Sequence, residues 1–134
     1  MDKLEFQNRT KQFAVNTARL CMQLPYNPIN KNYTNQIIRC SSSVGANYRA
    51  ACRAKSKADF INKLRIVEEE LDETLYFLEL LAEFNPEQKN DLRLLYKKGD
   101  QLLAMIVTSI NTTLKNINSE KSKAIKDRNL QSPI

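Results

Sequence analysis

The sequence predicts an all-α protein that folds as an antiparallel, up-down-up-down four-helix bundle. Apolar residues recur every three or four positions through most of the chain, which is the spacing of one face of a helix. No segment shows the strict alternation of apolar and polar residues that marks a half-buried strand. Four long helices with short connections pack most simply as such a bundle. We expect the bundle to occupy residues 1–118 and a polar, basic C-terminal tail to occupy residues 119–134.

The first two helices are expected at about residues 2–24 and 32–54. The apolar stripe of the first ends where the chain meets Pro25 and Pro28, because proline lacks the backbone N–H that a helix interior needs. The second helix carries six residues at heptad-like spacing: Tyr33, Ile37, Cys40, Val44, Asn47 and Ala51.

The last two helices are expected at about residues 57–84 and 87–118. Ser56 and Asp59 resemble a capping box, in which two side chains satisfy free amides at a helix start. A long apolar stripe follows them: Phe60, Leu64, Val67, Leu71, Leu75, Leu78 and Leu81. The Asn-Pro pair at 85–86 ends this helix and begins the next one, since Pro is favoured at the first helical position.

The composition excludes several classes of enzyme. The chain has no His, so Ser-His-Asp and Cys-His nucleophiles cannot form. It has two Gly, which are too few for a loop that wraps phosphate groups. We therefore expect no enzyme, no cofactor and no metal site. One cluster of carboxylates is interpreted as a solvent-exposed helix face: Glu68, Glu69, Glu70, Asp72 and Glu73.

The three cysteines, Cys21, Cys40 and Cys52, lie at least twelve positions apart, so they form no Cys-x-x-Cys motif. We interpret them as small buried residues in a reducing cytoplasm. The N-terminus lacks the apolar segment of a signal peptide, and no run approaches the ~18 apolar residues of a membrane span. We expect a cytoplasmic protein with no membrane partner.

Three motifs follow one another between residues 36 and 60. They are Gln36-Ile37-Ile38-Arg39, Ser43-Val44-Gly45-Ala46-Asn47 and Arg53-Ala54-Lys55-Ser56-Lys57-Ala58-Asp59-Phe60. Together with the Glu-rich helix that comes next, this order resembles the four-helix bundle family of 23S rRNA intervening sequence proteins, over about residues 4–117. The accessory proteins of diversity-generating retroelements are more distantly similar. The chain departs from the family pattern at Ala50 and Ala51, where relatives usually have Glu and Gly.

The resemblance implies a bacterial-type protein that assembles as a ring-like homo-oligomer, often a pentamer. It also implies nucleic acid as a suspected partner, with no established catalysis.

The second expected helix presents a small and polar surface. Four of its side chains are interpreted as polar residues of helix packing or of an oligomer contact: Gln36, Arg39, Ser43 and Asn47. Buried amides often fix register in helical assemblies, so we expect Gln36, Ser43 and Asn47 to hydrogen-bond to a neighbouring helix. Gly45 costs about 1 kcal/mol relative to Ala in a helix interior, which favours close approach of a neighbouring helix. A ligand-binding notch is the alternative.

The third expected helix has more apolar residues than one stripe requires. The additional ones spread around its other side: Tyr76, Phe77, Leu80 and Phe84. Large exposed apolar patches usually mark interfaces, so these residues are a possible oligomer interface. The alternative is that packing of the fourth helix and the first helix covers them.

The net charge of +6 is unevenly distributed along the chain. If the second and third helices turn at Ser56, position n lies opposite position 112 minus n, which places Arg39 opposite Glu73. Folding the whole chain in this way gives two ends of the bundle, or poles, with different charges. The pole that contains the turn at Ser56 has a charge of +9, and the opposite pole has a charge of −3. We expect the basic pole to contact nucleic acid through ten residues: Arg49, Arg53, Lys55, Lys57, Lys63, Arg65, Lys121, Lys123, Lys126 and Arg128.

The leading hypothesis is therefore a non-enzymatic homo-oligomeric bundle that binds RNA or DNA through phosphate contacts at the basic pole. No RNA recognition motif, zinc finger or aromatic stacking platform is present, so base-specific readout is not expected. The alternative is a structural or protein-interaction adaptor whose basic end meets an acidic protein partner. No small-molecule substrate is inferred.

Overall fold

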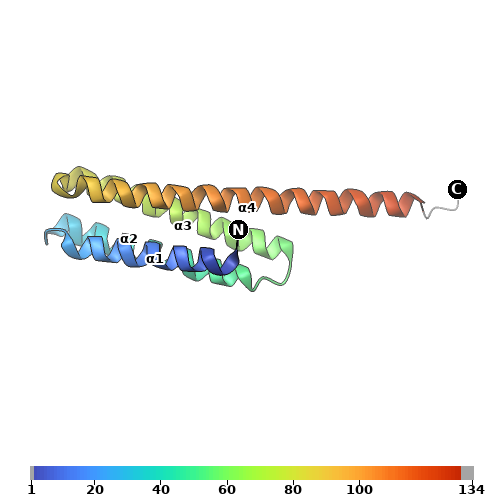
Figure 1. The fold of residues 1–134 in the computed structure, drawn as a ribbon, viewed down its shortest axis with the longest axis horizontal. Coiled ribbons are helices and arrows are strands. Elements are labelled where there is room, and N and C mark those ends of the chain that lie inside the picture. Colours follow the sequence, from blue (N-terminus) through green and yellow to red (C-terminus); the bar gives the residue numbers. More distant parts are fainter. Residues whose placement is uncertain (1, 131–134) are drawn as a thin grey trace.

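The structure is a computed structural model that describes residues 2–130. It consists of four long helices and one short turn of 3-10 helix (Figure 1). These elements are α1 (Lys3–Gln23), α2 (Pro28–Cys52), α3 (Lys57–Phe84), η1 (Pro86–Gln88) and α4 (Lys89–Leu130). The described part of the chain contains no strand, so the all-α prediction is confirmed.

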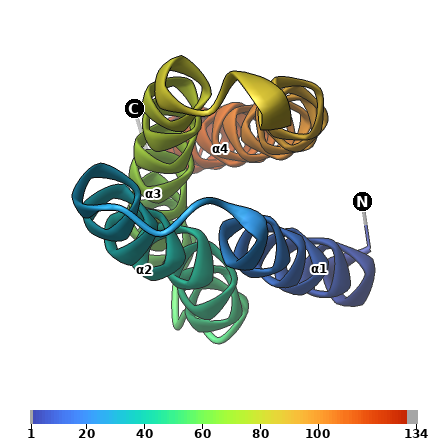
Figure 2. The same ribbon diagram turned by 90° about the vertical axis from the view of Figure 1, so that its left-hand side faces the viewer.

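Successive helices run in opposite directions, and contacts between distant residues identify the neighbouring helices (Figure 1). The ring centroids of Phe6 and Tyr48 lie 4.5 Å apart, which joins the start of α1 to the end of α2. Arg39 donates a hydrogen bond to Glu73 at 2.7 Å between α2 and α3, in the register that the sequence predicts. Viewed from the end, α3 lies between α2 and α4, while α1 lies beside α2 (Figure 2).

The start of α2 differs from the prediction because the helix begins at Pro28, four residues before position 32. Asn27 caps the helix, since its Oδ1 accepts a hydrogen bond from the amide of Asn30 at 2.8 Å. Pro28 then occupies the first turn, where its missing N–H is not needed. The cap of α3 is the predicted one: the amide of Asp59 donates to Ser56 Oγ at 3.1 Å.

The last helix is longer than the sequence predicts. It ends at Leu130, whereas the apolar pattern supports a helix only to residue 118. Fully buried side chains of α4 end at Ile110, and residues 118–129 are exposed on all sides. A helix without a buried face needs no apolar stripe, so periodicity cannot predict this segment. The last part of the expected tail, residues 131–134, lies outside the described residues.

Both glycines mark close contacts between helices. A Cβ on Gly45 would lie 3.2 Å from Thr10 Oγ1, so α1 approaches α2 closely at this position. A Cβ on Gly99 would lie 2.9 Å from Leu75 Cδ2 and 3.0 Å from Phe13 Cζ, so α3 and α1 both approach α4 there. Gly45 thus serves helix packing, as the sequence favours, rather than a ligand notch.

A pair of buried amides joins the first turn of α2 to the residue after α3, at the end of the bundle away from the α2/α3 turn. Asn30 and Asn85 are each 3% exposed, and the Nδ2 of each donates to the Oδ1 of the other at 2.8 Å. Their remaining N–H groups donate to the carbonyls of Pro25 and Leu81. Because these buried amides are fully paired, they fix the register of α2 against α3. The sequence predicts such a role for Asn47 instead.

Candidate nucleic-acid interface

The end of the bundle that contains the α2/α3 turn presents exposed bases from three segments. Arg49 and Arg53 lie one helical turn apart at the end of α2, Lys55 lies in the turn, and Arg65 lies near the start of α3. All four residues are exposed, and none forms an ion pair within residues 2–130. We define the basic pole as these four residues and six more: Lys57, Lys63, Lys121, Lys123, Lys126 and Arg128.

Two bases of the pole are already paired. Lys57 forms an ion pair with Glu120 of α4, and Lys63 donates to Asp59 Oδ1 at 2.7 Å within α3. The hydrogen bond from Lys63 holds the pKa of Asp59 below its ordinary value. Lys57 and Lys63 are therefore less available to an anionic partner than the four exposed bases of the bundle end.

The end of α4 extends the basic pole beyond the bundle. The contact between Lys57 and Glu120 marks the level at which α4 passes the start of α3. The helix then continues past the α2/α3 turn into solvent (Figure 1). Its exposed bases are Lys121, Lys123, Lys126 and Arg128. The structure thus presents the charges of the expected tail on a projecting helix.

The polar residues of α2 differ from the prediction in their hydrogen bonds. Asn47 Nδ2 donates to the carbonyl of Ser43 at 2.9 Å, so this bond lies within α2 rather than between helices. Gln36 is exposed to solvent. Of the four residues, Arg39 is the one for which the described chain shows a side-chain hydrogen bond to α3.

Glu70 differs from the other carboxylates of its cluster. Its side chain is 17% exposed, and its buried Oε2 has no hydrogen-bond partner, with Arg39 Nη1 3.9 Å away. Burial raises the pKa of Glu70, and the nearby carboxylate of Glu73 raises it further. The prediction of a solvent-exposed cluster is therefore wrong for this residue, because position 70 lies at the edge of α3 that faces α2.

An aromatic patch joins α3 to α2 at the end away from the basic pole. Tyr76 and Phe84 are 56% and 54% exposed, while Phe77 and Leu80 are half-buried. The ring centroid of Tyr33 lies 6.0 Å from those of both Phe77 and Phe84. It is therefore α2, rather than packing of α4 and α1, that covers part of this surface.

The cysteines lie mainly in the interior of the bundle. Cys21 and Cys40 are buried, Cys52 is half-buried, and all three are free thiols. Burial raises the pKa of the Cys21 and Cys40 thiols. The hydroxyl of Thr74 donates to Cys40 Sγ at 3.2 Å, which helps to hold α3 against α2.

In the described range, no three Cys, Asp or Glu side chains are grouped so that they could hold a metal ion. None of the helices there is both long enough and apolar enough to cross a membrane.

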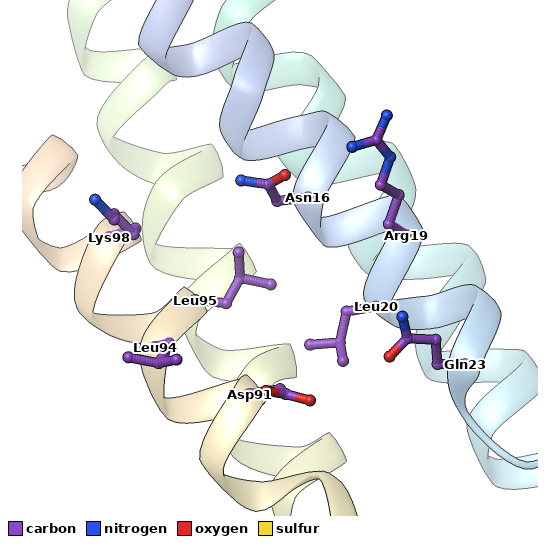
Figure 3. Close-up of a pocket in the computed structure, with 8 residues that line it drawn as sticks. All are labelled: Asn16, Arg19, Leu20, Gln23, Asp91, Leu94, Leu95 and Lys98. Carbon is purple, nitrogen blue, oxygen red and sulfur yellow. The ribbon is translucent and has the colours of Figure 1, made fainter.

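A groove lies between α1 and α4, which pack less closely than the other neighbouring helices. One hollow in it has a volume of about 420 Å³, and Leu20 and Leu95 point toward one another across it (Figure 3). A second hollow of about 140 Å³ continues the groove past Phe13 and Leu102.

Comparison with known proteins places the chain in a family. A sequence profile described as 23S rRNA-intervening sequence protein matches residues 2–108. The chain is also similar to a solved structure of a protein with unknown function, from the S23 ribosomal protein family of Bacteroides thetaiotaomicron. The two are 30% identical with a TM-score of 0.72, over 83% of this chain and 99% of that chain. No curated protein matches. The chain therefore belongs to the family of 23S rRNA-intervening sequence proteins.

Proposed function

We propose that this protein is a non-enzymatic, homo-oligomeric helical bundle that binds RNA or DNA through phosphate contacts at its basic pole. The observation that carries this proposal is the group of exposed bases Arg49, Arg53, Lys55 and Arg65, which are unpaired within the described chain. Guanidinium and ammonium groups bind phosphate oxygens and release condensed counterions, which makes the affinity depend strongly on salt.

Assembly increases the number of phosphate contacts that one complex can make. In a ring of parallel subunits, the basic poles lie on one face and their fields add. The α4 extensions would project from the same face and widen it. We propose a pentamer because the family resemblance implies one.

Base-specific readout is not part of the proposal. Single-stranded RNA is usually read by aromatic rings that stack on its bases. The exposed aromatic rings of Tyr76 and Phe84 lie toward the end of α3, away from the bases near its start. The basic pole therefore supports contacts to the phosphate backbone of either nucleic acid.

The proposal is tested by fluorescence titration of labelled RNA and DNA between about 50 and about 200 mM salt. Affinity should fall steeply as salt rises. Replacing Arg49 and Arg53 with Ala should reduce the logarithmic salt slope by up to about 1.8, since each phosphate contact contributes about 0.9 on duplex DNA. The matched control replaces Arg93 and Lys97 with Ala, which removes the same charge from the opposite pole and should leave the slope unchanged.

Two results would overturn the proposal. One is the absence of binding to either nucleic acid at about 50 mM salt, where phosphate contacts are least screened. The other is an equal loss of slope in the control. If a polyglutamate chain binds while RNA and DNA do not, the function is that of an adaptor for an acidic protein.

A further inference from the structure

One face of α3 carries a row of exposed acids. We define the acidic ridge as Glu69, Asp72, Tyr76, Glu79 and Glu83, whose spacing of three and four residues places them on one stripe of the helix. All five residues are exposed. The four carboxylates form no ion pair anywhere in residues 2–130. Like charges three or four residues apart destabilise a helix, so a partner of opposite charge would stabilise α3.

The groove between α1 and α4 has the opposite charge. Three bases and one acid line it: Arg9, Arg19, Lys98 and Asp91. Its floor is apolar and is formed by Phe13, Leu20, Leu95 and Leu102. The groove therefore offers a surface for a helix that carries acids around an apolar or aromatic centre.

Arg9 has a weak partner within its own chain. Its Nη1 donates to Met105 Sδ at 3.2 Å, across the groove from α1 to α4. A thioether sulfur is a weak acceptor, whereas a carboxylate forms a shorter and stronger hydrogen bond with a guanidinium group. A carboxylate that enters the groove would thus improve the hydrogen bonding of Arg9.

We infer that the acidic ridge of one copy docks into the α1/α4 groove of a second copy. This inference rests on the proposed self-assembly and supplies its interface. The ridge carboxylates would meet Arg9, Arg19 and Lys98, while Tyr76, at the centre of the ridge, would meet the apolar floor. Tyrosine is one of the residues most often found to dominate binding energy at such centres.

The geometry of this contact determines the kind of assembly. Ridge and groove are different surfaces, so the contact is head-to-tail, and its repetition gives either a closed ring or a filament. Nucleic acid in the groove would bring phosphates against Asp91 and an apolar floor, and it would leave the ridge unpaired. A second copy of the chain satisfies both surfaces in the same contact.

The test uses two complementary charge reversals in the full chain. The ridge variant carries Glu69→Lys, Asp72→Lys and Glu79→Lys, which changes the ridge charge from −4 to +2. The groove variant carries Arg19→Glu and Lys98→Glu, which changes the charge of the groove lining from +2 to −2. Light scattering should give the unchanged protein a mass that is a multiple of 15.5 kDa. Each variant alone should have the mass of one chain, because its ridge and its groove then carry the same sign of charge. A variant that combines both sets of changes in one chain should regain the larger mass, since its ridge and its groove are again opposite in charge.

The control reverses two exposed charges outside both surfaces, through Lys31→Glu and Glu87→Lys, and should still assemble. Circular dichroism checks that every variant remains helical. The inference is overturned if the unchanged protein has the mass of one chain, if either variant keeps the larger mass, or if the combined variant fails to regain it. If the unchanged protein has the mass of one chain and binds an acidic helical peptide, the groove is a docking site for another protein. If the unchanged protein assembles as expected but binds no nucleic acid, the proposed function is rejected and the inferred interface is not.

Discussion

At the scale of single residues, Glu70 is an acid whose environment disfavours its charge. Its Oε2 is buried and lacks a hydrogen bond, and the carboxylate of Glu73 lies nearby. Arg39 offsets part of this cost, but its shorter contact is with Glu73 at 2.7 Å rather than with Glu70 at 3.9 Å. The ionised form of Glu70 is therefore less compatible with the folded state than with the unfolded state.

The change Glu70→Gln keeps the shape of the side chain and removes its charge. Because the pKa of Glu70 is raised in the folded protein, the folded state binds its proton more tightly than the unfolded state. The stability gained in this way is present at low pH and is lost as pH rises through the raised pKa. We expect the variant to melt at a higher temperature than the unchanged protein at about pH 7 and at a similar temperature at about pH 3.

Thermal melting followed by circular dichroism measures this difference. Glu87→Gln, at an exposed position, should alter the melting temperature equally at both pH values. A lower melting temperature of Glu70→Gln at about pH 7 would show that the attraction of Arg39 outweighs the effect of burial.

Residue pairs differ in how far the sequence predicts them. The pair of Arg39 and Glu73 follows from the position of one turn, since the residues are equally distant from Ser56. The pair of Asn30 and Asn85 does not follow, because a helix that starts at position 32 leaves Asn30 in a loop. Recognising Asn27 as a cap before Pro28 would have moved Asn30 into the helix.

At the scale of elements, α4 divides into a part that packs and a part that does not. Its buried residues end at Ile110, with Leu114 and Ile117 half-buried after them. The exposed segment after Glu120 has no described contact that would make the fold depend on it. Residues 121–129 are therefore exposed and available for the proposed binding, and they are not part of the core.

Removal of residues 121–134 tests this division. We expect the free energy of unfolding to change by no more than about 0.5 kcal/mol, as for other changes at exposed positions. The affinity for nucleic acid should fall, and the salt slope should decrease by about 0.9 for each removed base that contacts a phosphate. Urea denaturation and the salt titration measure the two effects.

A full-length variant separates charge from helix length. Replacing Lys121, Lys123 and Lys126 with Gln keeps the helix and should reproduce most of the loss of binding. A truncated chain that binds as tightly as the full chain would contradict a binding role for this segment.

The bounds of the helices show what sequence patterns can detect. The start of α3 is predicted because Ser56 and Asp59 form a capping pattern directly before a long apolar stripe. The start of α2 is missed because proline both breaks a helix and begins one, and only the cap at Asn27 distinguishes the two cases. The end of α4 is missed because its residues 118–129 are exposed and bury no apolar face against the described part of the chain.

At the scale of the whole molecule, assembly decides how many basic poles one nucleic acid can meet. A single bundle end presents few bases, whereas several poles on one face act together and raise the effective affinity. The interface between copies therefore affects binding even though its residues are not bases of the pole.

The change Tyr76→Ser tests this dependence without altering net charge. We expect the mass in solution to shift toward one chain, since the aromatic centre of the acidic ridge is lost. The salt slope for nucleic acid should decrease as well, because fewer poles then share one nucleic acid. Light scattering and the salt titration on the same samples measure both quantities.

Leu94→Ser, at a position 66% exposed beside the groove, should have the same effect on mass. Smaller mass with an unchanged salt slope would show that one pole is sufficient for binding.

The sequence predicts the helical fold and the positions of the charges better than it predicts the surfaces that helices leave open. Periodicity shows which residues of each helix face the interior, but it does not show that α1 and α4 pack loosely. The groove with Arg9 and Lys98 therefore emerges only from the structure. Of the ridge acids, Glu69 and Asp72 belong to the cluster that the sequence suggests is a solvent-exposed face, and Glu79 and Glu83 carry no prediction.

The length of α4 has a consequence for hydrodynamic measurements. Its 42 residues extend for about 63 Å at 1.5 Å per residue, whereas a compact chain of this size has a radius of gyration of about 14 Å. An elongated particle experiences more friction than a sphere of equal mass, so it elutes early from a column calibrated with compact proteins. A single chain could then pass for a dimer, and the shortened chain would elute later without any change in the number of subunits.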